Sequence, residues 1–259
     1  MLMPMLSEKD ALLYDECVIL KSMPYKESDR LVTVFSKNFG KKNLLAKGAC
    51  KPGSKIGGFT DSLSIINYGA KPTRSFTLLT QPKIISALFH IKEMGPSFYK
   101  AYAMCELILR ASEFDAKMPL IYDTLKNSLI IMDLLPSDDE TGPAKVSIKF
   151  QLFWLKYTGF MFNFENCLNC GLKLGDNYSY DYSYGGNICY RCCIGRSDIM
   201  EIKPYIKAII DISTEPNLKI IIETAYTKNA LGFISELIKR HIKANLNIVL
   251  ASDAMNGPI

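Results

Sequence analysis

Four of the eight cysteines in this 259-residue chain form two Cys-x-x-Cys pairs, Cys167/Cys170 and Cys189/Cys192, which are separated by 18 residues. The two-residue gap allows both thiolates of a pair to face one ion, and this spacing is typical of structural zinc sites. Four thiolates complete a tetrahedral sphere, so the pattern predicts one Zn²⁺ ion that stabilises the fold and has no open position for catalysis. Cys193 follows Cys192 directly, which leaves the identity of the fourth ligand open. Four free thiols and an iron–sulfur cluster are the alternatives.

The second chemical feature is a run of seven basic residues between Arg30 and Thr60 that contains no Asp or Glu. Residues 1–85 carry 13 Lys and Arg against 7 Asp and Glu, whereas residues 86–259 carry 18 against 19. The net charge of +5 therefore originates in the first third, which predicts an anionic partner there. A solvated basic face is the alternative. The predicted nucleic-acid contacts are Arg30, Lys37, Lys41, Lys42, Lys47, Lys51, Lys55 and Arg74.

Aromatic residues are interleaved with these cations. Tyr25, Phe39 and Phe59 are candidates for stacking on bases, while Phe35, inside an apolar run, is predicted to be a core residue. A cationic groove with stacking rings is how OB folds bind single strands.

Few residues suit catalysis. The two histidines, His90 and His241, begin neither an H-x-E nor an H-E-x-x-H signature, so the chain is predicted not to be an enzyme. The enzymatic alternative is a nuclease or nucleotidyltransferase in which Asp29 and Asp61 hold Mg²⁺, although Asp29 adjoins Arg30 and is more simply its partner.

The elements that position these residues follow from periodicity. Short β-rich runs at 16–22, 30–37, 42–48, 61–69 and 74–81 alternate with Gly- and Pro-containing turns and predict a five-stranded OB barrel over 1–85. After Gly95-Pro96 the apolar period becomes 3.6 residues, which predicts a helical bundle over 86–259 with the zinc module, 165–195, inserted. The predicted fold class is α+β multi-domain.

The compartment follows from what the sequence lacks. There is no run of 18 apolar residues and no secretory signal at the start, so we expect a cytoplasmic protein without a membrane partner, whose cysteines stay reduced.

Residues 24–58, "PYKESDRLVTVFSKNFGKKNLLAKGACKPGSKIGG", resemble the bacterial RecO family of DNA-repair mediators. The similarity continues through "LTQPKII" at 79–85, "YTGFMFNFENCLNCG" at 157–171 and the second cysteine pair. One departure is Cys50, which stands after Lys-Gly-Ala where the family often carries a basic residue.

The resemblance implies binding of single- and double-stranded DNA, annealing, and loading of RecA onto strands coated by single-strand-binding protein, with RecR as partner and the nucleoid as location. It also implies a groove for the acidic C-terminal tail of single-strand-binding protein. Our candidate is the amphipathic segment 230–246, with Lys239, Arg240 and Lys243 as partner-binding residues, and an ordinary surface helix is the alternative. An RNA-binding or ribosome-associated protein is the alternative, because OB folds serve both nucleic acids.

Overall fold

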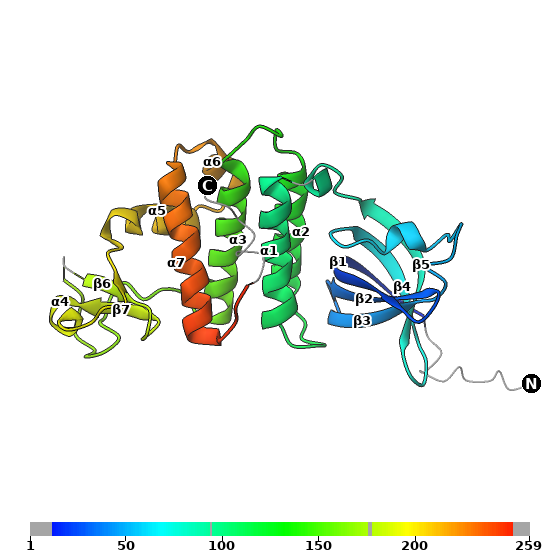
Figure 1. Cartoon of the computed structure of the whole chain (residues 1–259), viewed down its shortest axis with the longest axis horizontal. Coiled ribbons are helices and arrows are strands. Elements are labelled where there is room, and N and C mark those ends of the chain that lie inside the picture. Colours follow the sequence, from blue (N-terminus) through cyan, green and yellow to red (C-terminus); the bar gives the residue numbers. More distant parts are fainter. Residues whose placement is uncertain (1–11, 94, 176–177, 251–259) are drawn as a thin grey trace, which may run out of the picture. The chain divides into compact units, whose positions relative to one another are not determined.

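The computed structural model of the chain describes residues 12–93, 95–175 and 178–250. It divides into two compact units, Met1–Leu134 and Leu135–Ile259 (Figure 1). We call them the first and the second unit. The predicted domain boundary after residue 85 stays a prediction, because a compact packing unit need not coincide with a domain that folds alone.

The first unit is built on a closed five-stranded barrel, as predicted, with the strand order β1-β2-β3-β5-β4. All neighbours are antiparallel except β3 and β5, which close the barrel by a short parallel contact at Leu44 and Leu45. Alternating residues such as Val32 and Val34 point inward and join one buried cluster. Each such side chain contributes about 1.5–3 kcal/mol through burial. The strands are β1 (Leu13–Tyr25), β2 (Asp29–Ser36), β3 (Gly40–Ala46), β4 (Ile65–Pro72) and β5 (Thr77–Ser86).

The last two strands begin three to four residues later than predicted. Residues 57–59 form a 3-10 turn, and Leu63 has a left-handed backbone with φ of 61°. An extended strand cannot pass through that conformation. The chain therefore enters β4 only at Ile65.

Two helices complete the first unit, α1 (Pro96–Ala111) and α2 (Pro119–Asp133). Both begin with proline, whose missing N–H is no loss in the first helical turn. The helices pack on each other through buried stripes that include Met104 and Leu125, and α1 also contacts β1.

The second unit is organised around α3 (Gly142–Thr158), most of whose residues are buried. Three helices pack against it, in agreement with the helical bundle predicted for this part of the chain (Figure 1). They are α5 (Lys203–Thr214), α6 (Leu218–Glu223) and α7 (Lys228–Leu246).

The segment of the chain that connects α3 to α5 forms a small sheet with the strand order β7-β6-β8. We call residues 165–175 and 178–200 the cysteine module. β6 and β7 form an antiparallel hairpin, in which Tyr178 pairs with Cys189. The module contains β6 (Tyr178–Asp181), β7 (Gly186–Cys189), α4 (Tyr190–Cys193) and β8 (Ile199–Met200). Across the part of the chain that the structure describes, no helix is both long enough and apolar enough to cross a bilayer.

Candidate metal centre and nucleic-acid interface

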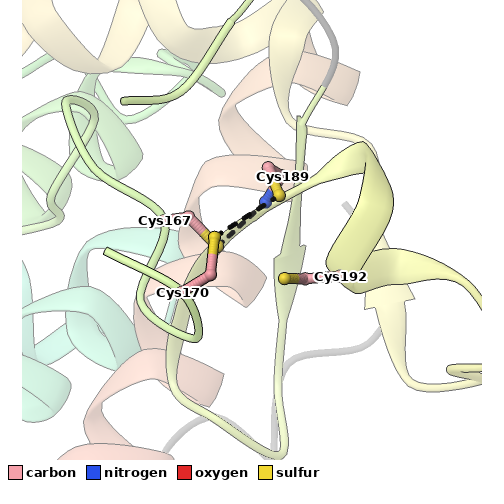
Figure 2. A group of neighbouring side chains, drawn as sticks. All are labelled: Cys167, Cys170, Cys189 and Cys192. Carbon is pink, nitrogen blue, oxygen red and sulfur yellow. Dashed lines mark hydrogen bonds between the residues drawn. The ribbon is translucent and has the colours of Figure 1, made fainter. Parts of the chain in front are cut away.

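The cysteine module brings together the four cysteines that the spacing singled out (Figure 2). Their Sγ atoms all lie within 4.8 Å of one another, and those of Cys170 and Cys189 are 3.8 Å apart. A tetrahedron with Zn–S bonds of about 2.3 Å has edges of about 3.8 Å. The donor set of Cys167, Cys170, Cys189 and Cys192 therefore fits one tetrahedral metal ion.

Local backbone geometry places each pair. Gly171 has a left-handed φ of 74°, and its N–H donates to the Cys167 carbonyl at 2.8 Å, which closes a tight turn around the first pair. Cys189 ends β7 and caps α4, so that Cys192 follows one helical turn later. The β6–β7 hairpin returns this second pair to the first.

Hydrogen-bond donors reach two of these sulfurs, those of Cys167 and Cys192. Burial opposes ionisation of Cys167, but backbone N–H groups of Cys189, Cys170 and Asn169 point at its Sγ and lower its pKa to about 6. Asn169 also donates its side-chain amide to the Cys192 Sγ at 3.2 Å. Thiolate is the form that binds metal, so the surroundings of Cys167 suit the ligand role.

Cys193 lies outside this group. Its Sγ is 3.7 Å from the Ile188 carbonyl, to which it donates. The structure thus gathers Cys192 rather than Cys193 with the other three cysteines, a choice that the spacing left open.

The basic residues of the first unit fall into two sets. The first set anchors the barrel to its helices: Lys37 pairs with Asp123 at 2.9 Å, and Lys42 pairs with Asp115. For Lys41 the prediction of a nucleic-acid contact is corrected, because this residue is only 5% exposed.

Lys41 has a structural role at the end of α1. Its Nζ donates to the Leu109 carbonyl at 2.7 Å and lies 4.6 Å from the centre of the Phe114 ring. Burial lowers the pKa of this lysine. Leu109 is one of the last four carbonyls of the helix, which lack partners within the helix itself, so Lys41 acts as a C-cap and is not available to a phosphate.

We expect Lys41→Met to lower the free energy of unfolding of the protein by about 1–3 kcal/mol, because it leaves a helix-end carbonyl without its donor. The salt dependence of nucleic-acid binding should not change. Lys47→Met is the matched control: it should change stability by less than about 0.5 kcal/mol. Urea unfolding of both variants checks this, and equal stabilities would contradict the capping role.

Arg30 and the two aspartates of the enzymatic alternative also hold the fold together. Arg30 pairs with Asp61 at 3.0 Å and donates to Thr60 at 3.1 Å. Asp29 accepts from the backbone N–H of Gly48 at 2.8 Å and so fixes the loop that leaves β3.

The second set of cations is exposed and lies on loops at one end of the barrel. The loop after β3 carries Lys47, Lys51 and Lys55, and the turn between β4 and β5 carries Arg74. Because β5 starts beside Leu44 and Leu45, this turn lies next to the end of β3. None of these four cations forms an ion pair with a described residue.

An aromatic pair marks the same end of the barrel. Tyr25, before the β1–β2 turn, and Phe76, in the β4–β5 turn, pack edge to face with ring centres 5.7 Å apart. Phe76 is 36% exposed, whereas Phe35 is fully buried in the core, as predicted. These two turns are among the loops that bind oligonucleotides in OB folds.

Three residues at this end were missed by sequence reasoning: Phe76, and the exposed cations Lys26 and Lys71. Lys26 lies 5.5 Å from the centre of the Tyr25 ring. The sequence feature that could have identified them is their position beside a predicted turn, because the ends of neighbouring strands lie close together there. We call Lys26, Lys47, Lys51, Lys55, Lys71, Arg74, Tyr25 and Phe76 the loop surface.

The predicted partner-binding residues lie together on α7. Arg240 donates to Glu236 at 2.6 Å and covers the Tyr182 ring at 4.4 Å, and Lys239 lies 3.7 Å from Glu236. Lys243 is exposed and forms no ion pair with a described residue. All three cations border a pocket of about 450 Å³.

Comparison with known proteins shows one family. A family model described as recombination protein O matches residues 11–88 with its N-terminal part and 96–248 with its C-terminal part. A DNA repair protein RecO of Clostridium novyi is 30% identical over 178 residues, which cover 68% of each chain. The DNA repair protein RecO of a Thermoanaerobacter species is 26% identical over 243 residues, 90% of this chain and 95% of that protein. The similarity extends over both units.

Proposed function

Because this chain belongs to the recombination protein O family, which acts in DNA repair, we propose that it is a non-enzymatic recombination mediator. It binds single- and double-stranded DNA and anneals complementary strands. It also loads RecA onto strands coated by single-strand-binding protein, together with RecR, at the nucleoid in the cytoplasm.

The loop surface is the observation that carries this proposal. Its cations have no carboxylate partners among the described residues and are free to replace the counterions of phosphates. Its ring pair, in which Phe76 is exposed and Tyr25 half-buried, provides a face for stacking on unpaired bases; in a duplex the bases stack on one another. Lysine contacts to phosphate are independent of sequence, as annealing of arbitrary complementary strands requires.

We further propose that the four cysteines hold one structural Zn²⁺ ion. A closed tetrahedral set of four thiolates is characteristic of zinc, with iron–sulfur chemistry as the competing use of such ligands. The ion would cross-link the two cysteine pairs, and the chain's own residues orient the thiolates around it.

For the acidic, apolar C-terminal tail of single-strand-binding protein we propose the α7 pocket. The lining of the pocket includes three cations and two carboxylates, those of Glu236 and Asp198, so its net charge is +1. Val249 adds an exposed apolar side chain at its rim.

Strand annealing tests the function directly. We expect the protein to accelerate annealing of complementary oligonucleotides, both bare and coated with single-strand-binding protein. In competition, single-stranded DNA should displace a labelled strand better than RNA of the same sequence. Absence of annealing, or preference for RNA, would favour the ribosome-associated alternative.

A further inference from the structure

The α7 pocket is composite, because the cysteine module supplies one of its walls. α7 contributes Glu236, Arg240 and Lys243, while Tyr182 follows β6 and Asp198 precedes β8. Neither element forms the pocket alone. Its shape therefore depends on how the module is held against α7.

One arginine links the metal ligands to the wall of the pocket. The Nε of Arg196 donates to the carbonyl of Cys192 at 2.7 Å, and its Nη1 donates to Asp181 at 2.8 Å. Its guanidinium group also lies 4.1 Å from the centre of the Tyr184 ring. Arg196 thus ties the turn that carries Cys192 to the β6–β7 turn.

The β6–β7 hairpin is fastened to α7 at three points. Tyr182 lies beneath Arg240, the Tyr180 hydroxyl is 2.6 Å from His241 Nδ1, and Asn245 donates to the Gly185 carbonyl at 2.9 Å.

The hydrogen bond between Tyr180 and His241 is buried, and its direction is set by the other ring nitrogen. His241 Nε2 lies 2.6 Å from the Phe160 carbonyl, which can only accept. Nε2 therefore carries the hydrogen, and Nδ1 accepts from Tyr180. Displacing the hairpin from α7 would leave these polar groups buried without partners, a cost of about 1–3 kcal/mol for each.

We propose that metal binding at the four cysteines and peptide docking in the α7 pocket are coupled, with Arg196 as the positioning residue between them. Without the metal, the turn that carries Cys192 loses its cross-link and no longer fixes Arg196. The β6–β7 turn then loosens and the pocket loses its second wall. For the identity of the peptide this inference rests on the proposed function; the coupling between the module and α7 does not.

Amide hydrogen exchange on the full-length protein tests the coupling without any peptide. We expect removal of the metal by a chelator to accelerate exchange in the C-terminal half of α7, residues 237–246, by about 5-fold or more, the lower end of usual coupling strengths. Exchange in α1 and α2 of the first unit should not change. Unchanged exchange in α7 after loss of the metal would overturn the proposal.

Arg196→Ala separates the link from the metal itself, because all four cysteines remain. This variant should retain one metal ion per chain and still show the faster exchange in α7. Arg191→Ala is the matched control, since Arg191 is an exposed arginine of the same module without an ion pair to a described residue. Equal exchange in the two variants would remove Arg196 from the link.

Peptide binding supplies a reciprocal test. A synthetic acidic, apolar C-terminal peptide should bind the metal-loaded wild type about 5-fold or more tightly than it binds Arg196→Ala. The coupling must also be reciprocal: metal should strengthen peptide binding to the wild type, and the peptide should raise the apparent metal affinity by the same factor. Failure of the metal-loaded wild type to bind the peptide would refute the proposed tail site. Equal affinities with and without metal would refute the coupling.

Discussion

Replacing Cys167 or Cys189 by serine should abolish metal binding and unfold the cysteine module. The strands of the module have four, four and two residues, too few for a sheet of this size to be stable by itself. Structural zinc contributes apparent binding free energies of about 10–16 kcal/mol at neutral pH in zinc-finger peptides. We therefore expect the metal to be the main source of the module's stability.

Metal analysis of protein purified without added zinc, combined with thermal unfolding, measures both effects. We expect one zinc ion per chain in the wild type, and loss of the ion with a lower unfolding temperature in either variant. Cys193→Ser is the control, because this thiol points to the Ile188 carbonyl and not into the group of four. A stably folded wild type that contains no metal would refute the zinc proposal, and iron in its place would favour a cluster.

Replacing Lys47, Lys51 and Lys55 together by alanine should weaken DNA binding by up to about 100-fold at moderate salt, since each phosphate contact contributes about 1 kcal/mol or less. The three residues are exposed and have no ion-pair partner among the described residues, so the fold and the metal content should be unaffected. A plot of log affinity against log salt for single-stranded DNA should lose about two units of slope, close to 0.7 per released contact.

The control for this triple variant must remove the same charge from elsewhere. Lys117, Lys156 and Lys207 are exposed, lie outside the loop surface and form no ion pair with described residues, so their joint replacement by alanine should leave the slope unchanged. Lys126 is unsuitable as a control, because it pairs with Glu16 at 2.8 Å. Identical slopes for the Lys47/Lys51/Lys55 variant and the wild type would show that these lysines are exposed to solvent at the end of the barrel and do not contact DNA.

Features that depend on a few neighbouring residues could be predicted from the sequence. The two-residue gap within Cys167/Cys170 and Cys189/Cys192 dictates that each pair can face one ion, whatever the rest of the chain does. Strand alternation and the 3.6-residue period likewise report local burial, and they predicted the barrel and the helices of both units.

The partners of charged side chains were decided only by the tertiary structure. Lys41 and Lys47 are both lysines of one basic run, yet the first caps α1 through a residue 68 positions away, and the second forms no ion pair with any residue that the structure describes. Nothing within a few residues of either lysine distinguishes them, because the carbonyl that accepts from Lys41 reaches it only when α1 packs on the barrel. The same holds for the α7 pocket, whose two walls are far apart along the chain and meet through contacts such as the buried hydrogen bond between Tyr180 and His241.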